Sequence, residues 1–260
     1  MFIFINRSGS RCEFESIIFL NFLNYMVNRV IKMLFLCFSC LVTVHVSAAG
    51  DDDRAKFSDY YTSATAVPLA PESDGFIRRW TILEPIAKSI SSNALLTDDY
   101  MSEVMSETYF KDQFTVIPVD GSKVKYGKTS LVWHALDSKR FYVNLLRFAQ
   151  GLGKEFFEQM YWAVTIIDCE EDIPNVRLAG GVNSGAVWYL NGQEVLKFTN
   201  DRDLVVDDCA SKRITLKKGR NILRGAVLNG QGMATFCLRF LDEKGEPVTN
   251  FTVSSSLKKK

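Results

Sequence analysis

The chain has 260 residues, a formal net charge of +1 and 23% charged residues, the composition of an ordinary globular protein. Its length is sufficient for one substantial hydrophobic core or for two smaller ones. The near-neutral charge and the lack of a dense basic stripe in the sequence argue against nucleic acid as the main partner.

The start of the chain is typical of a secretory signal peptide, and we assign residues 1–48 to a leader, of which residues 1–25 are interpreted as an over-extended start. Residues 33–46 are almost continuously apolar and follow a polar, positive stretch. We expect cleavage near Ala48, in preference to a lipoprotein anchor at Cys40. The apolar run is shorter than the roughly 20 residues of a stable transmembrane helix. The leader therefore predicts a protein that is secreted, periplasmic or held at the cell surface.

Composition divides the rest of the chain into an arm, a domain and a tail. Residues 49–73 are polar and small, with two prolines, and are predicted to form a linker or extended arm. The domain is predicted over residues 74–253, and residues 254–260 form a tail. One short helix is predicted over residues 98–107, because Thr97 and two aspartates suit the start of a helix and the positive end of its dipole.

Apolar runs of strand length recur along the predicted domain. The run 160–167 is the most β-prone, and its near-continuous apolarity predicts a strand buried on both faces. A helical turn is expected just before it, over residues 154–159. Strands at a spacing of about 8–12 residues are typical of an all-β sandwich or barrel. The predicted strands are 80–83, 114–118, 131–134, 141–146, 160–167, 176–182, 186–190, 194–198, 213–216, 221–229 and 234–241.

The clearest local signal in the sequence is the dipeptide Asn191-Gly192 between two apolar runs. Both central residues of a type I′ turn have positive φ, which asparagine and glycine tolerate. The sequence therefore predicts a β-hairpin with its turn at these two residues.

Three separated motifs occur in a fixed order and resemble one known kind of module. They are the opening Gly75–Pro85, the hairpin Ala186–Val195 and the strand entry Leu216–Leu223. Together they resemble the galactose-binding-like jelly-roll modules of secreted bacterial carbohydrate-active proteins, including the sugar-binding domains of glycoside hydrolase family 2. The resemblance covers about residues 75–250 and implies an all-β jelly-roll sandwich. It also implies a non-catalytic module that binds glycans or assists extracellular polysaccharide utilisation.

Aromatic strand residues are the first candidates for a glycan site, because a sugar ring has an apolar face and a polar rim. Trp188 and Tyr189 alternate along one strand, so one of them is expected nearer solvent. Trp133 and His134 are candidates for the same reason, and Asn183 is a candidate from the loop before the hairpin. The two other tryptophans of the domain, Trp80 and Trp162, stand in apolar runs and are predicted to lie in the core.

The sequence does not predict an enzyme. His134 is the one histidine beyond the leader, and the serine of residues 181–185 stands one position late for a nucleophile elbow. Two alternatives stay open beside glycan binding: a structural or protein-interaction module that packs against a partner, and a glycan hydrolase or esterase.

No cofactor is expected, apart from a possible structural calcium. Asp207 and Asp208 are the candidate ligands, since hard cations prefer carboxylate oxygens. The domain also holds Cys169, Cys209 and Cys237, whose spacing matches no zinc motif. One disulfide with one buried thiol, or three separate core cysteines, both fit this odd number.

Overall fold

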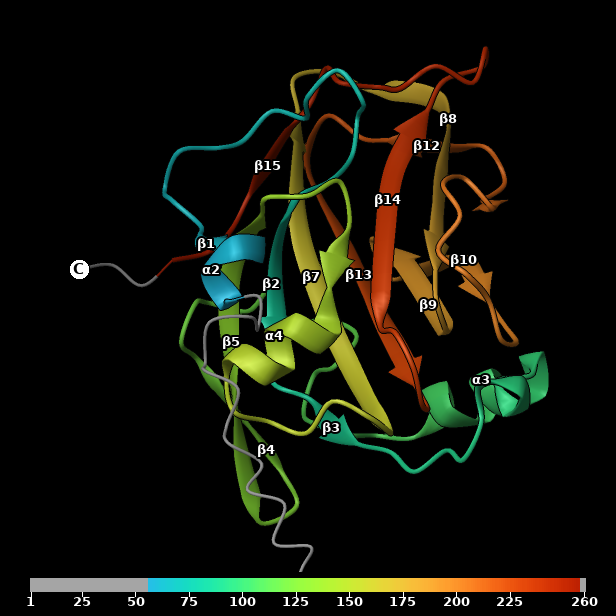
Figure 1. Cartoon of the computed structure of the whole chain (residues 1–260). Coiled ribbons are helices and arrows are strands. Elements are labelled where there is room, and N and C mark those ends of the chain that lie inside the picture. Colours follow the sequence, from blue (N-terminus) through green and yellow to red (C-terminus); the bar gives the residue numbers. More distant parts are fainter. Residues whose placement is uncertain (1–55, 258–260) are drawn as a thin grey trace, which may run out of the picture. The chain divides into compact units, whose positions relative to one another are not determined.

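Two antiparallel β-sheets of ten and five strands make up the part of the chain that the structure, a computed structural model, describes (residues 56–257; Figure 1). The predicted leader, its cleavage near Ala48 and the alternative anchor at Cys40 lie outside these residues. The all-β sandwich is thus confirmed. Among residues 56–257, no helix combines the length and apolar character needed to cross a membrane.

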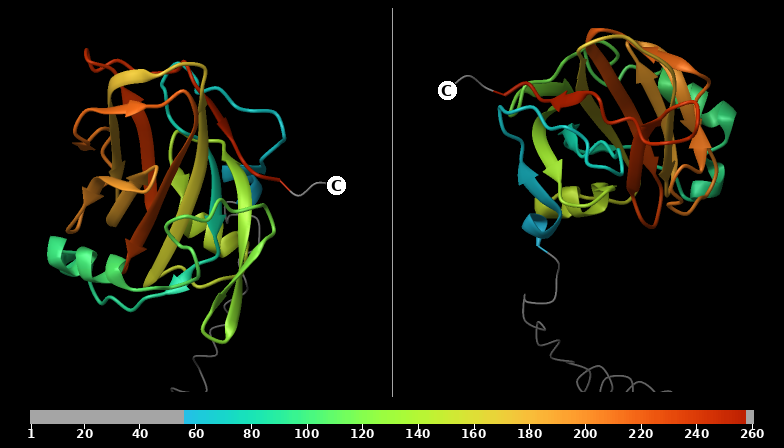
Figure 2. Two further views of the ribbon diagram at one scale, coloured as in Figure 1. Left: turned by 180° about the vertical axis from the view of Figure 1, so that it is seen from behind. Right: turned by 90° about the horizontal axis from the view of Figure 1, so that it is seen from above.

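The large sheet runs in the order β1-β5-β2-β7-β13-β9-β10, and the small sheet runs in the order β11-β8-β14-β6. β3 and β15 also pair with β7, β4 pairs with β5, and β12 pairs with β8. Figure 2 shows the two sheets from behind and from above. The strands are β1 Tyr61–Ser63, β2 Arg79–Leu83, β3 Ile86–Ala87, β4 Lys123–Tyr126, β5 Thr129–Ser138, β6 Val143–Asn144, β7 Gln159–Cys169, β8 Ile173–Val182, β9 Gly185–Leu190, β10 Gln193–Phe198, β11 Cys209–Ala210, β12 Ile214–Leu216, β13 Gly219–Asn229, β14 Thr235–Leu241 and β15 Thr252–Ser254. The helices are α2 Phe57–Tyr60, η1 Asn93–Leu95, α3 Asp98–Ser106 and α4 Leu145–Gly151.

β7 is the central strand, as its apolar sequence predicts. It pairs with β13 along its whole length, from Cys169 opposite Gly219 to Gln159 opposite Asn229. All its residues except Asp168 are buried. Because β7 is covered on both faces, neither face needs polar residues, and its sequence does not alternate between apolar and polar residues.

The predicted hairpin and the predicted helix are both confirmed. Asn191 and Gly192 have φ values of 52° and 84°, and they join β9 to β10. The Asn191 side chain also ties the turn to β13, because its Oδ1 accepts from the backbone N–H of Ile222 at 2.8 Å. At the start of α3, Thr97 Oγ1 accepts from the backbone N–H of Tyr100 at 3.2 Å, which is an N-cap.

The first hydrophobic core lies between the two sheets. At its centre three large rings pack together: Trp80 from β2, Trp188 from β9 and Phe236 from β14. The centroid distances are 5.4 Å for the two tryptophans, and 5.1 Å and 4.9 Å from Phe236 to Trp80 and Trp188 respectively. Rings at these distances add attraction beyond the burial of their area.

A second core covers the outer face of the large sheet. Residues 84–128 cross this face and bring α3 and a loop with Phe110 onto it. The ring of Phe110 lies edge-on to Trp133 at 6.0 Å and to Trp162 at 5.6 Å. The large sheet is therefore buried on both sides over much of its area. Both tryptophans predicted for the core, Trp80 and Trp162, are fully buried.

Three predicted elements differ in the structure. Residues 114–118 form a turn and extended chain instead of a strand, because the N–H groups of Thr115 and Val116 donate to the carbonyl of Asp112. Residues 141–146 contain only the short β6, because Asn144 caps α4 by accepting from the N–H of Arg147 at 3.0 Å. No helical turn forms over residues 154–159.

The predicted arm of residues 49–73 is partly built into the sandwich. β1 pairs with β5, with Tyr61 opposite Ser138. Tyr61 is buried, and its hydroxyl donates to the carbonyl of Asn144 at 2.6 Å. The hydroxyl and the aromatic ring of one residue therefore anchor a segment that the sequence predicts to be a linker or extended arm.

Candidate functional site

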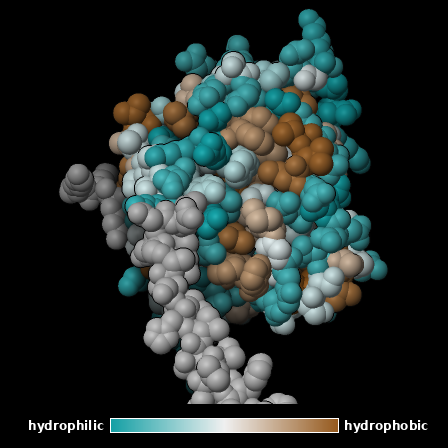
Figure 3. Space-filling model, in the orientation of Figure 1, coloured by the Kyte–Doolittle hydropathy of each residue, from teal (hydrophilic) through white to brown (hydrophobic). Residues whose placement is uncertain are grey.

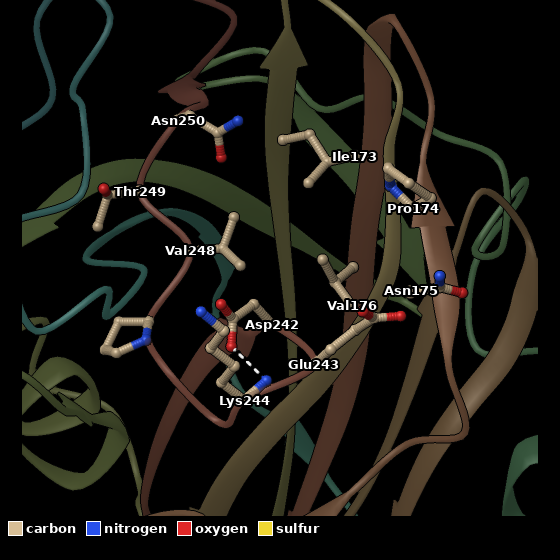
Figure 4. A pocket seen from close by; sticks show the side chains of 11 residues that line it. Ile173, Pro174, Asn175, Val176, Asp242, Glu243, Lys244, Val248, Thr249 and Asn250 are labelled. Atoms are coloured by element: carbon tan, nitrogen blue, oxygen red, sulfur yellow. Dashed lines mark hydrogen bonds between the residues drawn. The ribbon is translucent and has the colours of Figure 1, made fainter.

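A groove lies at the end of the sandwich where β7 ends, β8 begins and β14 ends. It consists of two adjoining cavities of about 530 and 440 Å³ that share Thr249 and Asn250. We call the two cavities together the end groove. The larger one lies between residues 173–176 on one side and residues 242–250 on the other (Figure 4).

The start of β8 forms one wall of the end groove. Pro174 and Asn175 are exposed, whereas Val176 is buried and faces the first core. Asn175 has a φ of 59°, a left-handed conformation that asparagine accepts more readily than most residues. The wall thus carries an exposed amide directly beside a buried valine.

A tight turn after β14 forms the opposite wall. Asp242 Oδ1 accepts from the backbone N–H groups of Lys244 at 2.8 Å and of Glu246 at 2.9 Å. The bond from Glu246 and, to a smaller extent, the bond from Lys244 favour the charged carboxylate, and they therefore hold the pKa of Asp242 below its ordinary value. Gly245 completes the turn with a φ of 85°.

The chain then returns along the groove through Val248, Thr249 and Asn250. Val248 is buried and its N–H donates to the carbonyl of Phe240 at 2.9 Å, whereas Thr249 and Asn250 are exposed. The end groove therefore has an apolar floor of buried valines and a rim of amide, hydroxyl and carboxylate groups. Arg213 links the two walls outside the floor, because its guanidinium donates to the carbonyls of Asn175 and Glu243.

The smaller cavity adds the end of β7 to the site. Asp168 and Glu170 lie on its lining together with Thr252. Asp168 accepts from the hydroxyl of Ser254 at 2.7 Å and lies 3.6 Å from Nε of Arg220. With Asp242 and Glu243, the end groove holds more acidic than basic side chains, and it offers mostly acceptors to a ligand.

The aromatic candidates do not line this groove. Trp188 and Trp133 are fully buried, the first between the sheets and the second in the outer core, so neither ring has a face open to a ligand. Tyr189, on the opposite face, is nearer solvent than Trp188, as the alternation predicts, but only 9% of its surface is exposed, so it offers little to a ligand. The physical reason is the cover of residues 84–128, which buries the face that Tyr189 shares.

His134 is partly exposed but lies away from the end groove. Its Nε2 is 3.8 Å from Oε1 of the buried Glu84, which also lies 3.4 Å from Nζ of Lys154. The imidazole packs edge-on against Phe148 at 5.7 Å. The contacts of His134 are those of a residue at the edge of the first core.

Asn183 lies in the loop before the hairpin, where it serves the fold. Its side-chain oxygen accepts from the hydroxyl of Thr235. Ser184 next to it is fully buried, and a Cβ atom on Gly185 would lie 2.7 Å from Sδ of Met101. α3 therefore packs against the loop of residues 183–184, which the sequence suggested as part of a glycan site.

Asp207 and Asp208 are each paired with an arginine. Asp207 receives two hydrogen bonds from Arg239, and Asp208 receives two from Arg202. The carboxylates proposed for a structural calcium are thus already neutralised, and the geometry does not bring them together on one cation. Within residues 56–257, no group of three or more His, Cys, Asp or Glu side chains has the arrangement of a metal site.

The three cysteines of the domain are separate free thiols. Cys209 and Cys237 lie on strands that flank β8 on opposite sides, beside Gly180 and Gly181. This matches the alternative of three separate cysteines. Burial raises the pKa of the Cys237 thiol to about 11, because the thiolate loses its hydration.

Sequence reasoning missed the residues of the end groove, chiefly Asn175, Asp242, Thr249 and Asn250. They come from two chain segments about seventy residues apart, and the pairing of β8 with β14 brings them together. The turn residues Asp242 and Gly245 are a signal for the turn, but not for a groove beside it.

No family model matches the sequence, and no curated protein matches it. Among solved structures, the chain is similar to the PA14 domain of the antifreeze protein MpAFP, with 10% identity, a TM-score of 0.37 and coverage of 76% of this chain and 96% of that one. It is also similar to a PA14 sugar-binding domain from an RTX adhesin, with 10% identity, a TM-score of 0.36 and coverage of 69% and 99%. Similarities at these TM-scores carry no argument about function.

Proposed function

We propose that this chain is an exported, non-catalytic module that binds a glycan in the end groove. The observation that carries the proposal is the polar rim over an apolar floor. Asn175, Thr249 and Asn250 present exposed amide and hydroxyl groups around the buried Val176 and Val248. A sugar ring matches this arrangement, because its C–H faces are apolar and its hydroxyls point outward around the rim.

The size and charge of the end groove define the class of sugar. A cavity of about 530 Å³ is within the range of small-ligand sites. Asp242 and Glu243 outnumber Lys244 on the larger cavity, so the groove favours neutral or amino sugars over acidic ones. No aromatic side chain lines this cavity, so affinity rests on hydrogen bonds to sugar hydroxyls.

Figure 3 shows one face of the molecule, on which apolar residues form a broad patch in the upper half and smaller patches elsewhere, with polar areas between them. A contiguous apolar face would favour the alternative of a module that packs against a partner.

A glycan array with the purified protein, followed by titration calorimetry on each hit, tests the proposal. Thr249→Ala and Asn250→Ala each remove a rim group, and we expect each to weaken binding by roughly fivefold, the worth of one hydrogen bond. Gln231→Ala is the matched control, because Gln231 is exposed and follows the end of β13 that pairs with the start of β7, at the opposite end of the sandwich.

Each outcome bears on one alternative. A folded protein that binds no glycan, or whose binding is unchanged in both rim variants, would overturn the proposal and leave partner packing as the better reading. Release of new reducing ends from a bound glycan would support the hydrolase alternative instead.

A further inference from the structure

A second cavity lies at the end of the sandwich opposite the end groove. It has a volume of about 520 Å³ and lies between the chain that follows β3 and the first turn of α3. In Figure 1 this stretch of chain runs along the lower end of the sandwich. We call it the α3 cavity, and it is lined by Ser89, Ile90, Ser91, Leu95, Thr97 and Tyr100.

Hydrogen bonds to two other segments hold the loop that forms the α3 cavity. Asn93 is 6% exposed, and its Oδ1 accepts from the backbone N–H of Gly230 at 2.9 Å. Its Nδ2 donates to the carbonyl of Gln231 at 3.3 Å. The carbonyl of Leu96 accepts from the N–H of Asn200 at 2.7 Å. The loop is therefore fixed in place by the fold, as in most sites for small ligands.

The α3 cavity is open to solvent and has an apolar surface. Leu95 is 52% exposed, whereas Ile90 is buried. Tyr100 is half-buried, and it packs against the second core. Ser89, Ser91 and Thr97 are exposed. A ligand can therefore reach an aromatic ring and a leucine here directly from solvent.

Three hydroxyl groups border this apolar surface, and their bonds within the protein leave capacity for a ligand. Thr97 Oγ1 accepts from the N–H of Tyr100, which uses a lone pair and leaves its O–H as a donor. Ser89 Oγ donates to Oε2 of Glu158 at 2.8 Å, which leaves its lone pairs as acceptors. Ser91 adds a third hydroxyl. Since none of the six lining residues carries a charge, the α3 cavity favours a neutral ligand.

We propose that the α3 cavity binds a neutral sugar residue, with one C–H face of the sugar against Tyr100 and Leu95. The hydroxyls of Ser91 and Thr97 then meet the sugar hydroxyls at the edge of the ring. The choice of a sugar rests on the proposed function, whereas the neutral and partly apolar character of the ligand follows from the cavity. The eleven residues of β7, roughly 35 Å, separate the α3 cavity from the end groove. One sugar ring therefore cannot occupy both, and the chain binds two sugar residues independently.

The test is a titration of the full chain with the methyl glycosides of glucose, galactose and mannose, followed by the methyl NMR signals of the protein. Ile90 and Leu95 report on the α3 cavity, and Val176 and Val248 report on the end groove in the same spectrum. We expect the Ile90 and Leu95 signals to shift and to saturate with at least one glycoside.

Variants of the two apolar residues test their contacts with the sugar, with the Ile90 signal as the readout. Tyr100→Ala should weaken binding by about three- to tenfold, the worth of one aromatic contact, and Tyr100→Phe should retain it because the ring remains. Leu95→Ser should weaken binding by about threefold, since it removes apolar surface. Tyr142→Ala is the control and should bind normally, because it removes another half-buried tyrosine that lines neither the α3 cavity nor the end groove.

The outcomes separate this proposal from the proposed function. Shifts confined to Ile90 and Leu95 support the α3 cavity and contradict the end groove, whereas shifts confined to Val176 and Val248 do the reverse. Binding that is unchanged in both Tyr100→Ala and Leu95→Ser overturns the proposal. Tighter binding of cyclohexanol, an apolar ring with a single hydroxyl, than of every glycoside overturns the choice of a sugar.

The thermal midpoints of the variants show whether each of them folds. Leu95 is exposed, so Leu95→Ser should keep the midpoint of the unaltered protein. Tyr100→Ala should have a lower midpoint, because it loses packing against the second core. If Tyr100→Ala does not fold, unchanged binding in Leu95→Ser is sufficient to overturn the proposal.

Discussion

Gly225 and Trp188 provide a sharp test of how the first core is packed. The two residues lie opposite each other on β13 and β9. A Cβ atom on Gly225 would lie 2.2 Å from Cε3 of the Trp188 ring. The ring has no room to retreat, because Trp80 and Phe236 pack against it at 5.4 and 4.9 Å. Gly225→Ala therefore adds a methyl group where a rigid, fully enclosed ring already stands.

The expected cost is that of overpacking a core. Such insertions lower the free energy of unfolding by about 1–3 kcal/mol. For a domain of this size that corresponds to a drop in Tm of roughly 2–12 °C. Urea unfolding followed by circular dichroism measures the loss, with an unchanged slope as evidence that the variant still unfolds in one step.

A double-mutant cycle isolates the cause. Trp188→Leu removes the ring and is itself destabilising, by about 3 kcal/mol. In that background Gly225→Ala should cost less than about 0.5 kcal/mol, because the added methyl group now meets free space. If Gly225→Ala costs the same in both backgrounds, the clash with Trp188 is not the reason for the loss and the argument is refuted.

Three other predictions concern single contacts. Asp137→Ala leaves the buried Arg79 without its carboxylate and should lower the free energy of unfolding by about 3 kcal/mol, measured by urea unfolding. Lys217→Ala is the control: it removes an exposed ion pair and should leave the urea midpoint unchanged. The free energy of unfolding of Asn191→Ala should be about 1 kcal/mol lower than that of Asn191→Gly. Both variants lose the side-chain bond to Ile222, but only alanine is strained at a φ of 52°. Equal stabilities of the two variants would contradict this. The bonds to the Asp242 carboxylate lower its pKa, so its contribution to stability is complete above its ordinary pKa of 3.8 and is lost as the pH falls through the lowered value. The difference in unfolding midpoint between the protein and Asp242→Asn should therefore shrink below about pH 4, and a difference that grows in acid would show that the sign is wrong.

Much of the sandwich is predictable because its signals are local. Asn191-Gly192 marks its turn through backbone conformation alone, and Thr97 marks the start of α3 through one side-chain bond. From β7 to β10, and again from β12 to β14, the strands follow one another with short turns, so each apolar run there corresponds to one strand.

The outer cover and the end groove are not predictable in the same way. Residues 107–119 are irregular, and they are placed by packing of Phe110 and Phe114 against tryptophan and tyrosine rings far away in the sequence. That packing buries Tyr189, which the alternation of its strand presents as a candidate for the surface. The end groove depends on the pairing of β8 with β14, which no local pattern encodes.

Tryptophan fluorescence can distinguish the two cores, because each core contains two of the four tryptophans. Trp80 and Trp188 report on the space between the sheets, and Trp133 and Trp162 report on the outer cover. All four are fully buried, so the native protein should emit at short wavelength and resist quenching by iodide. Replacing one pair with phenylalanine leaves the other pair as the sole source of tryptophan emission. Fluorescence would then show whether residues 84–128 detach from the sheet before the sandwich opens, or whether both cores melt as one unit.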